Sequence, residues 1–203
     1  MRLRRLLLGA AAVSIGAALW WRKHPSACPY GQRFWVEAPH PLITRARLRE
    51  VLDPKPGERI LEVGPGTGYY TLEMAEWVKP DGRVDILDLQ QEMLEHTMRS
   101  AAERGLDNIT PTQADASAMP YEDGTYDAAF LVTVLGEIPD QEAALRELAR
   151  VLRPGGRLVV GELLGDPHYV RLAPMRLRAS GVGLSYERRA GNAMGYFAHF
   201  AKS

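Results

Sequence analysis

The stretch that decides the fold is Ile60-Leu61-Glu62-Val63-Gly64-Pro65-Gly66-Thr67-Gly68, where an apolar run containing one acid leads into three alternate glycines. The apolar run predicts a strand. The glycines predict a tight loop, because glycine adopts positive φ and lets a ligand approach the main chain closely. Their spacing is G-x-G-x-G, which differs from the G-x-G-x-x-G of dinucleotide-binding folds. Pro65 also lacks the backbone N–H that a phosphate-binding loop donates, so a ligand less anionic than a pyrophosphate fits better.

A second strand-like run, residues 83–89, follows the glycines. About 20 residues past the glycines, doubly wound α/β folds place a carboxylate that accepts hydrogen bonds from ribose hydroxyls. Asp88 is the expected acceptor, and Asp85 is its competitor. Either acid could instead be an ordinary exposed strand or turn residue.

Three further blocks follow in chain order. Gln113-Ala114-Asp115-Ala116 offers another acid, which on its own is equally an N-cap or turn aspartate. Residues 126–132 predict a strand that leads into Leu135-Gly136-Glu137-Ile138-Pro139. Leu152-Arg153-Pro154-Gly155-Gly156 predicts a helix end and a turn before another strand at 157–160.

Together, the five blocks over about residues 58–163 resemble the class I S-adenosylmethionine-dependent methyltransferases, closest to the group called methyltransferase type 11. The resemblance implies an α/β fold with a Rossmann-like, doubly wound, seven-stranded sheet whose last strand is antiparallel. It also implies S-adenosylmethionine as cofactor, with Asp88 at the ribose and Asp115 at the adenine amino group. The cofactor-binding residues that it implies are Glu62, Gly64, Gly66, Thr67, Gly68, Asp88, Leu89, Asp115, Ala116, Leu131 and Val132.

The chain alternates helical and strand patterns, as an α/β protein requires. Apolar spacing predicts helices at 41–52, 71–79, 90–104, 141–152 and around 169–179, and a strand at 109–113. The alternation in 183–189 and 195–202 is poor, and these two strands are what the family resemblance implies. With 203 residues, 46% of them apolar and 25% charged, the chain can bury one full core. We expect residues 24–57 to be a connecting segment with a covering helix, and residues 58–203 to be the methyltransferase domain.

Residues 1–23 have a different character. Arg2, Arg4 and Arg5 precede an uncharged run that ends in Trp20-Trp21, and Arg22-Lys23 follow it. Flanking cations and terminal tryptophans favour an apolar helix that anchors the chain to a membrane. The run is shorter than the roughly 20 residues that span a bilayer, so a tilted or interfacial helix is an alternative. A cleaved signal peptide is less favourable because no small-x-small site follows directly, and a helix packed on the domain is the remaining alternative.

The formal net charge is zero, but the charges are unevenly distributed. Residues 1–57 carry 10 Lys and Arg against 3 Asp and Glu, residues 58–149 carry 6 against 19, and residues 150–203 carry 9 against 3. The basic ends could face anionic lipid headgroups or simply be solvated. No basic stripe with interleaved aromatics indicates a nucleic acid partner. Because S-adenosylmethionine is cytosolic, we expect a membrane-associated protein whose catalytic domain lies in the cytoplasm.

The chemistry of a sulfonium methyl group constrains the candidate residues. The methyl group is already activated, so transfer needs in-line approach and water exclusion more than a catalytic dyad. Glu137 occupies the place where many family members carry a substrate-facing residue, often a His, which leaves the base undetermined. Further candidates are His40, Tyr30 and His168. The substrate pocket is expected between residues 30–47, the Glu137 loop and residues 165–169.

Neither a disulfide nor a metal site is expected. Cys28 is the single cysteine, and the five histidines are scattered without metal-ligand spacing. The sequence therefore predicts methyl transfer to an apolar or amphiphilic small-molecule or lipid acceptor at the membrane. The alternatives are a catalytically silent, methyltransferase-like membrane scaffold and an NAD-dependent oxidoreductase. The Pro65 loop and its glycine spacing disfavour the oxidoreductase.

Overall fold

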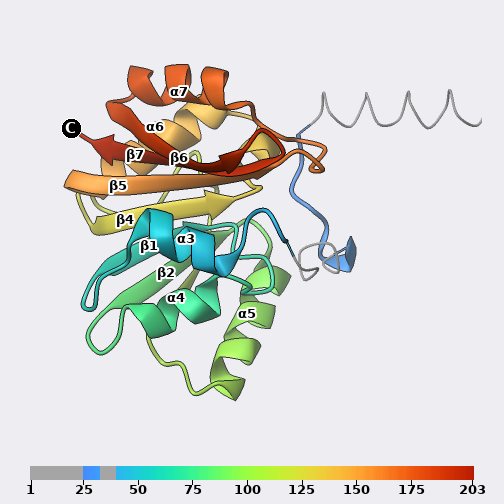
Figure 1. Ribbon diagram of the computed structural model, residues 1–203. Helices are drawn as coiled ribbons and strands as arrows, with labels where there is room; N and C mark the ends of the chain where they lie inside the picture. The colour runs from blue at the N-terminus through green and yellow to red at the C-terminus, as the bar shows by residue number, and fades with distance from the viewer. Residues whose placement is uncertain (1–24, 33–39) are drawn as a thin grey trace, which may run out of the picture.

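The computed structural model describes residues 25–32 and 40–203, which form an α/β fold around one seven-stranded sheet (Figure 1). The strands are β1 (Arg59–Val63), β2 (Arg83–Asp88), β3 (Ile109–Gln113), β4 (Tyr126–Val132), β5 (Leu152–Leu163), β6 (Leu184–Asn192) and β7 (Gly195–Lys202). Their order is β3-β2-β1-β4-β5-β7-β6. The first five strands pair in parallel, and β7 runs antiparallel to β5 and β6. The predicted doubly wound sheet with an antiparallel last strand is confirmed.

Helices cover both faces of the sheet. They are α3 (Arg45–Leu52), α4 (Thr71–Trp77), α5 (Gln91–Glu103), α6 (Gln141–Val151) and α7 (Leu172–Gly181), with 3-10 turns η1 (Tyr30–Gln32) and η2 (Leu135–Glu137). α3, α4 and α5 pack on one face, and α6 and α7 pack on the other (Figure 1). Since both faces are covered, the central strands are buried along most of their length, and β4 is buried from Ala128 to Val132.

Local capping explains where two helices begin. α3 starts at Arg45, four residues later than the pattern predicts, because the Thr44 side chain accepts the Arg47 N–H. The Asp140 carboxylate caps α6 in the same way by accepting the Ala143 N–H at 2.9 Å. Both capping residues satisfy a backbone donor that the first helical turn leaves unpaired.

The Pro-Gly-Gly turn differs from its prediction. β5 begins at Leu152, so the turn lies within the strand instead of before it. Pairing with β4 jumps from Tyr126↔Leu152 to Ala128↔Arg157, and the turn residues form an irregularity between these two pairs. A tight turn can thus be accommodated within a strand that pairs on either side of it.

The expected N-terminal apolar helix, residues 1–23, lies outside the described residues. Within residues 25–32 and 40–203, no helix is both long and apolar enough to cross a membrane.

Candidate functional site

The three glycines after β1 form the tight loop that the sequence predicts. Gly64, Gly66 and Gly68 all have positive φ, at 70°, 57° and 86°. A Cβ atom on Gly64 would lie 2.4 Å from a methyl carbon of Val134, so a side chain there is sterically excluded. The Thr97 hydroxyl donates to the Gly66 carbonyl at 3.0 Å and fixes the loop against α5. The glycines therefore set both the backbone conformation and the close packing of the loop.

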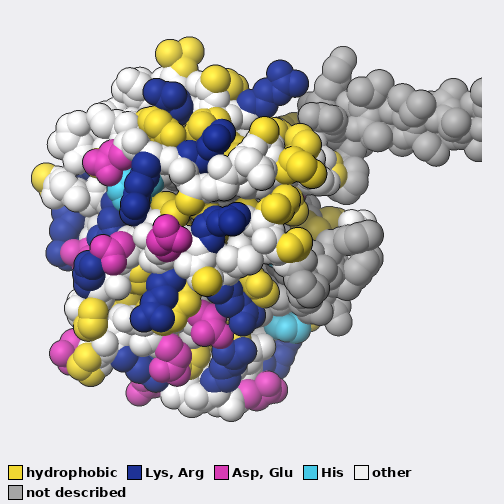
Figure 2. All heavy atoms as spheres, in the orientation of Figure 1, with side chains coloured by type: hydrophobic (Ala, Val, Ile, Leu, Met, Phe, Trp, Pro, Cys, Tyr) yellow, Lys and Arg dark blue, Asp and Glu magenta, His cyan; other side chains and the backbone are white. Residues whose placement is uncertain are grey.

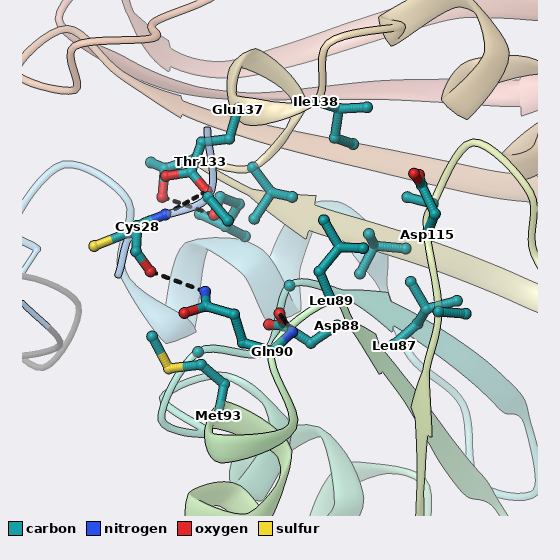
Figure 3. A pocket seen from close by; sticks show the side chains of 18 of the residues that line it. Cys28, Leu87, Asp88, Leu89, Gln90, Met93, Asp115, Thr133, Glu137 and Ile138 are labelled. Atoms are coloured by element: carbon teal, nitrogen blue, oxygen red, sulfur yellow. Dashed lines mark hydrogen bonds between the residues drawn. The ribbon is translucent and has the colours of Figure 1, made fainter. Parts of the chain in front are cut away.

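A cavity opens beside this loop at the carboxyl ends of β1, β2 and β4, where ligands bind in doubly wound sheets (Figure 3). Predicted site residues that line it are Gly64, Gly66, Asp88, Leu89, Asp115, Ala116, Val132 and Glu137. Figure 3 shows Asp115 across the cavity from Cys28 and Glu137, with Asp88 and Gln90 between them. Residues far apart in the sequence thus meet in one concave site.

Four predicted cofactor residues do not line this cavity: Glu62, Thr67, Gly68 and Leu131. Glu62 is 2% exposed and accepts a hydrogen bond from the Thr71 hydroxyl at 2.5 Å. Burial raises the pKa of its carboxyl to about 8. In this structure the Glu62 carboxyl therefore connects β1 to the first residue of α4 through a hydrogen bond beneath the glycine loop.

The two competing acids of β2 occupy different environments. Asp88, at the strand end, lines the cavity, and its Oδ1 accepts the Gln90 N–H at 2.9 Å. Burial raises its pKa. Asp85 is buried, accepts hydrogen bonds from Arg59 and Tyr126, and does not line this cavity. The geometry therefore favours Asp88 as the carboxylate that can reach a ligand.

Asp115 lies on the opposite wall of the cavity in an exposed turn. Its Oδ1 accepts both the backbone N–H and the hydroxyl of Ser117, at 2.8 and 2.7 Å. These hydrogen bonds to Ser117 lower the pKa of the Asp115 carboxyl. Asp115 is thus both a turn residue and an ionised acceptor at the cavity.

The segment 25–32 supplies a further part of the site, of which the sequence indicated only the residues from Tyr30 onward. The Cys28 N–H donates to Glu137 Oε2 at 3.2 Å, and the Cys28 carbonyl accepts the Gln90 side-chain amide at 2.9 Å. The Tyr30 N–H donates to the same Gln90 side chain, at Oε1 and 3.1 Å. Ala27 and Cys28 consequently line the cavity. We call residues 25–32 the N-terminal strap.

Thr133 is a second site residue that sequence reasoning missed. It has φ 56°, and its N–H donates to the Gly161 carbonyl at 2.8 Å. Positive φ is rare for a β-branched residue, and no sequence signal announces it. Such strained residues often occur at functional sites, and Thr133 lies at the end of β4 on the cavity wall.

Glu137 joins the first cavity to a second one. The second cavity shares with the first the residues Cys28, Gly64, Val132, Thr133 and Glu137. Burial, followed by the nearby Asp166 carboxylate, raises the pKa of Glu137 to about 8. Of the further candidates, His40 and His168 line the second cavity, whereas Tyr30 lines neither and contacts His96 Nδ1 at 3.2 Å.

The first cavity suits a nucleoside-bearing cofactor. Its walls are largely apolar, with Leu87, Met93 and Ile138 among them. Asp88 offers a carboxylate acceptor, and the glycine loop exposes main chain to a ligand without an intervening Cβ. Among the residues described, no cluster of His, Cys, Asp and Glu has the makeup of a metal site.

Comparisons with known sequences agree with this geometry. A family model described as a methyltransferase domain matches residues 60–156. The chain is 36% identical over 114 residues to the ubiquinone/menaquinone biosynthesis C-methyltransferase UbiE of Teredinibacter turnerae, a match that covers 56% of this chain and 46% of that protein. It is 42% identical over 115 residues to a 37.1 kDa protein of transposon TN4556 from Streptomyces fradiae, covering 57% of this chain and 33% of that protein. The chain thus spans half the length, or less, of these curated relatives.

Solved structures share the fold. A methyltransferase from Aquifex aeolicus, described as dependent on S-adenosylmethionine, superposes with a TM-score of 0.78 at 21% identity, covering 86% of this chain and 98% of that one. The [4+2]-cyclase SpnF superposes with a TM-score of 0.69 at 20% identity, covering 78% and 79%. Since the sequence match and the fold coincide at the glycine loop, we conclude that residues 60–156 form a methyltransferase domain of the class I S-adenosylmethionine-dependent type, with S-adenosylmethionine as cofactor.

Proposed function

We propose that this protein transfers the methyl group of S-adenosylmethionine to an apolar or amphiphilic small-molecule acceptor at a membrane. The observation that carries the proposal is that the cofactor cavity and the second cavity meet at Thr133 and Glu137. A donor in one cavity and an acceptor in the other would approach each other there. Close, oriented approach is the main requirement of methyl transfer from a sulfonium.

In this proposal the protein binds, orients and shields the reactants. The cofactor supplies an activated methyl group when bound. Asp88 would accept hydrogen bonds from its ribose, and the main chain of the glycine loop would allow its close approach. The N-terminal strap would exclude water on the side of Cys28.

Two observations support the proposal that the acceptor is apolar. Leu164 and Met194 are 53% and 59% exposed and are joined by a backbone hydrogen bond of 2.8 Å. Leu164 lies between Leu163 and Gly165, which both line the second cavity. Figure 2 shows hydrophobic side chains gathered on the side of the molecule where β5 ends. The relatives named for ubiquinone and menaquinone biosynthesis make a quinone-type ring the first acceptor to test.

Membrane association is proposed from residues 1–23, with the catalytic domain in the cytoplasm. The uncharged run between two groups of cations would hold the second cavity near the bilayer, where apolar acceptors concentrate. Deleting residues 1–23 should move the protein from the membrane fraction to the soluble fraction, with S-adenosylmethionine binding retained. Full-length protein found wholly in the soluble fraction would contradict the anchor.

Methyl transfer can be tested with methyl-labelled S-adenosylmethionine. Full-length protein is incubated with a membrane lipid extract and, separately, with the water-soluble metabolite pool. We expect labelled product in the lipid extract, with little when Asp88→Ala protein is used. Product confined to the water-soluble pool would reject the apolar acceptor. Cofactor binding without any labelled product would instead support the catalytically silent scaffold.

A further inference from the structure

The second cavity has walls that suit a flat ring. Tyr69 and Tyr70 contact each other edge to face, with centroids 4.8 Å apart, and His40 contacts Tyr69 at 5.8 Å. The Tyr70 hydroxyl donates to the Ile43 carbonyl at 2.5 Å, which fixes that ring. Leu163 and prolines complete the apolar part of the wall. Rigid aromatic and apolar walls favour planar aromatic ligands.

Carboxyl groups, and no Lys or Arg, line this cavity among the described residues. Glu137 and Asp166 line it from separate loops. Glu162 lies behind them at 1% exposure, and its Oε2 accepts the Val170 N–H at 3.0 Å. Its Oε1 is buried without a hydrogen-bond partner in the described structure. Burial raises the pKa of all three carboxyls, so this site already disfavours negative charge, and an anion that enters it loses its water and finds no Lys or Arg to pair with among the described lining residues.

Among the described residues, Glu137 is the one carboxyl group that both cavities share. It lines both cavities, and the Cys28 N–H holds its Oε2 at 3.2 Å. The titratable groups around it are Cys28 on the strap, Asp88 at the end of β2, Glu162 on β5, Asp166 in the following loop, and the two histidines of the second cavity, His40 and His168. A carboxyl in this surrounding is a stronger base than an exposed one, because burial and like charges disfavour its ionised form.

We propose that the second cavity binds an uncharged, hydroxyl-bearing aromatic acceptor and that Glu137 takes the hydroxyl proton during methyl transfer. This inference depends on the proposed function and specifies its substrate class. The O–H bond breaks with its proton passing to the Glu137 carboxylate, and the methyl–sulfur bond breaks with its electron pair staying on sulfur. The new bond forms to the phenolate oxygen, or to the adjacent ring carbon, which shares the negative charge and then loses its own proton to restore the hydroxyl. A neutral amine would attack with its lone pair and would not need this base.

Charge selection can be tested by binding, without knowing the natural acceptor. At pH 8.5, above the pKa of about 8 of Glu137, the full-length protein saturated with S-adenosylhomocysteine is titrated by calorimetry with 2-naphthol and with 6-hydroxy-2-naphthoate, which differ by one carboxylate. We expect 2-naphthol to bind at least tenfold more tightly. Glu137→Gln and Asp166→Asn should each reduce this ratio by threefold or more, whereas Asp81→Asn, in an exposed turn, should leave it unchanged. Equal or tighter binding of the carboxylate, or binding of neither probe, would overturn the assigned substrate class.

The base can be tested with 2-naphthol and labelled S-adenosylmethionine between pH 6 and 9.5. The wild-type rate should rise with an inflection at or below pH 8, and Glu137→Gln should lower the rate at least a hundredfold and remove the inflection. Retention of rate and inflection in Glu137→Gln, or binding of 2-naphthol without product, would overturn the role of Glu137. The lipid-extract assay tests the proposed function independently of these two experiments. That function is rejected if no component of the extract becomes labelled.

Discussion

At the scale of single residues, the site depends on a few side chains whose surroundings differ from those of an exposed position. Asp88 and Glu137 are acids at one cavity, and burial raises the pKa of both. The glycines of the loop stand where a Cβ would collide or a positive φ is required. Substitutions at these positions should therefore change a hydrogen bond, a pKa or the backbone conformation of the loop.

Replacing Asp88 by Ala should weaken the binding of S-adenosylmethionine by roughly tenfold to a hundredfold. The carboxylate is expected to accept ribose hydroxyls, and hydrogen bonds to a charged group contribute about 1.5–3 kcal/mol. Calorimetry would measure both dissociation constants, with Asp107→Asn, an exposed acid outside the cavity, as the matched control. Unchanged affinity in Asp88→Ala would exclude Asp88 as the ribose acceptor.

Binding of S-adenosylmethionine near pH 7 should release protons from Glu137, and binding of S-adenosylhomocysteine should not. With a pKa of about 8, Glu137 is mostly protonated at pH 7 in the free protein. The sulfonium charge favours its ionised form, and an opposite charge nearby lowers a pKa by about 1–3, so release is on the order of half a proton.

The released protons can be counted by calorimetry in two buffers of different ionisation enthalpy. Glu137→Gln should abolish the difference between the two ligands, whereas Glu142→Gln, on the exposed face of α6, should preserve it. Equal proton release with both ligands would show that Glu137 does not sense the sulfonium.

At the scale of elements, the N-terminal strap connects parts of the site that lie far apart in the chain. The Gln90 side chain holds the Cys28 carbonyl and the Tyr30 N–H, while its own backbone N–H binds Asp88. The strap also holds Glu137 through the Cys28 N–H. Gln90 therefore links Asp88 to the strap that lines the cavity.

Gln90→Ala should loosen the strap and expose Cys28. Since Cys28 is the single cysteine, alkylation by iodoacetamide reports on this segment directly. We expect at least threefold faster alkylation in Gln90→Ala, and slower alkylation of the wild type when S-adenosylhomocysteine is bound. The neighbouring Gln91→Ala is the matched control, because Gln91 contacts only the exposed Glu95 among the hydrogen bonds described. Identical alkylation rates in the two variants would reject the role of Gln90.

At the scale of the whole molecule, the fold keeps several carboxyl groups away from water. Burial raises the pKa of Glu62 to about 8 and that of Glu162 well above its usual 4.5. A carboxyl whose pKa is higher in the folded state binds more protons there than in the unfolded chain. The contribution of these two carboxyls to folding stability is therefore fully present below pH 4.5. It is lost as the pH rises toward and through their folded-state pKa values.

Glu162→Gln should make folding stability less dependent on pH. The amide cannot ionise and keeps an oxygen for the Val170 N–H. In urea unfolding, the wild type and Glu162→Gln should have similar free energies of unfolding at pH 5. At pH 8 the free energy of unfolding of the variant should be higher by about 1 kcal/mol or more, since one pKa unit corresponds to about 1.36 kcal/mol. Glu103→Gln, on the exposed face of α5, should follow the wild-type curve. A wild-type curve that is flat from pH 5 to 8 would contradict the effect.

The sequence determined the order of strands and helices, the glycine loop and the position of Asp88. Each of these depends on local rules: apolar periodicity, the backbone freedom of glycine, and the place of a strand end in a doubly wound sheet. The boundaries were less exact, because capping by Thr44 and the pairing of β5 across its turn depend on neighbouring residues in space.

Only the tertiary structure decided how the cavity is completed. Cys28 and Gln90 meet across 62 residues of chain, and Cys28 and Glu137 meet across 109, which no local pattern encodes. The positive φ of Thr133 arises from its place between β4 and the Gly161 carbonyl. The raised pKa of Glu137 is likewise a property of burial and of Asp166, which approaches it only in the folded chain, because desolvation and like-charge repulsion depend on distance in space and not on separation in sequence.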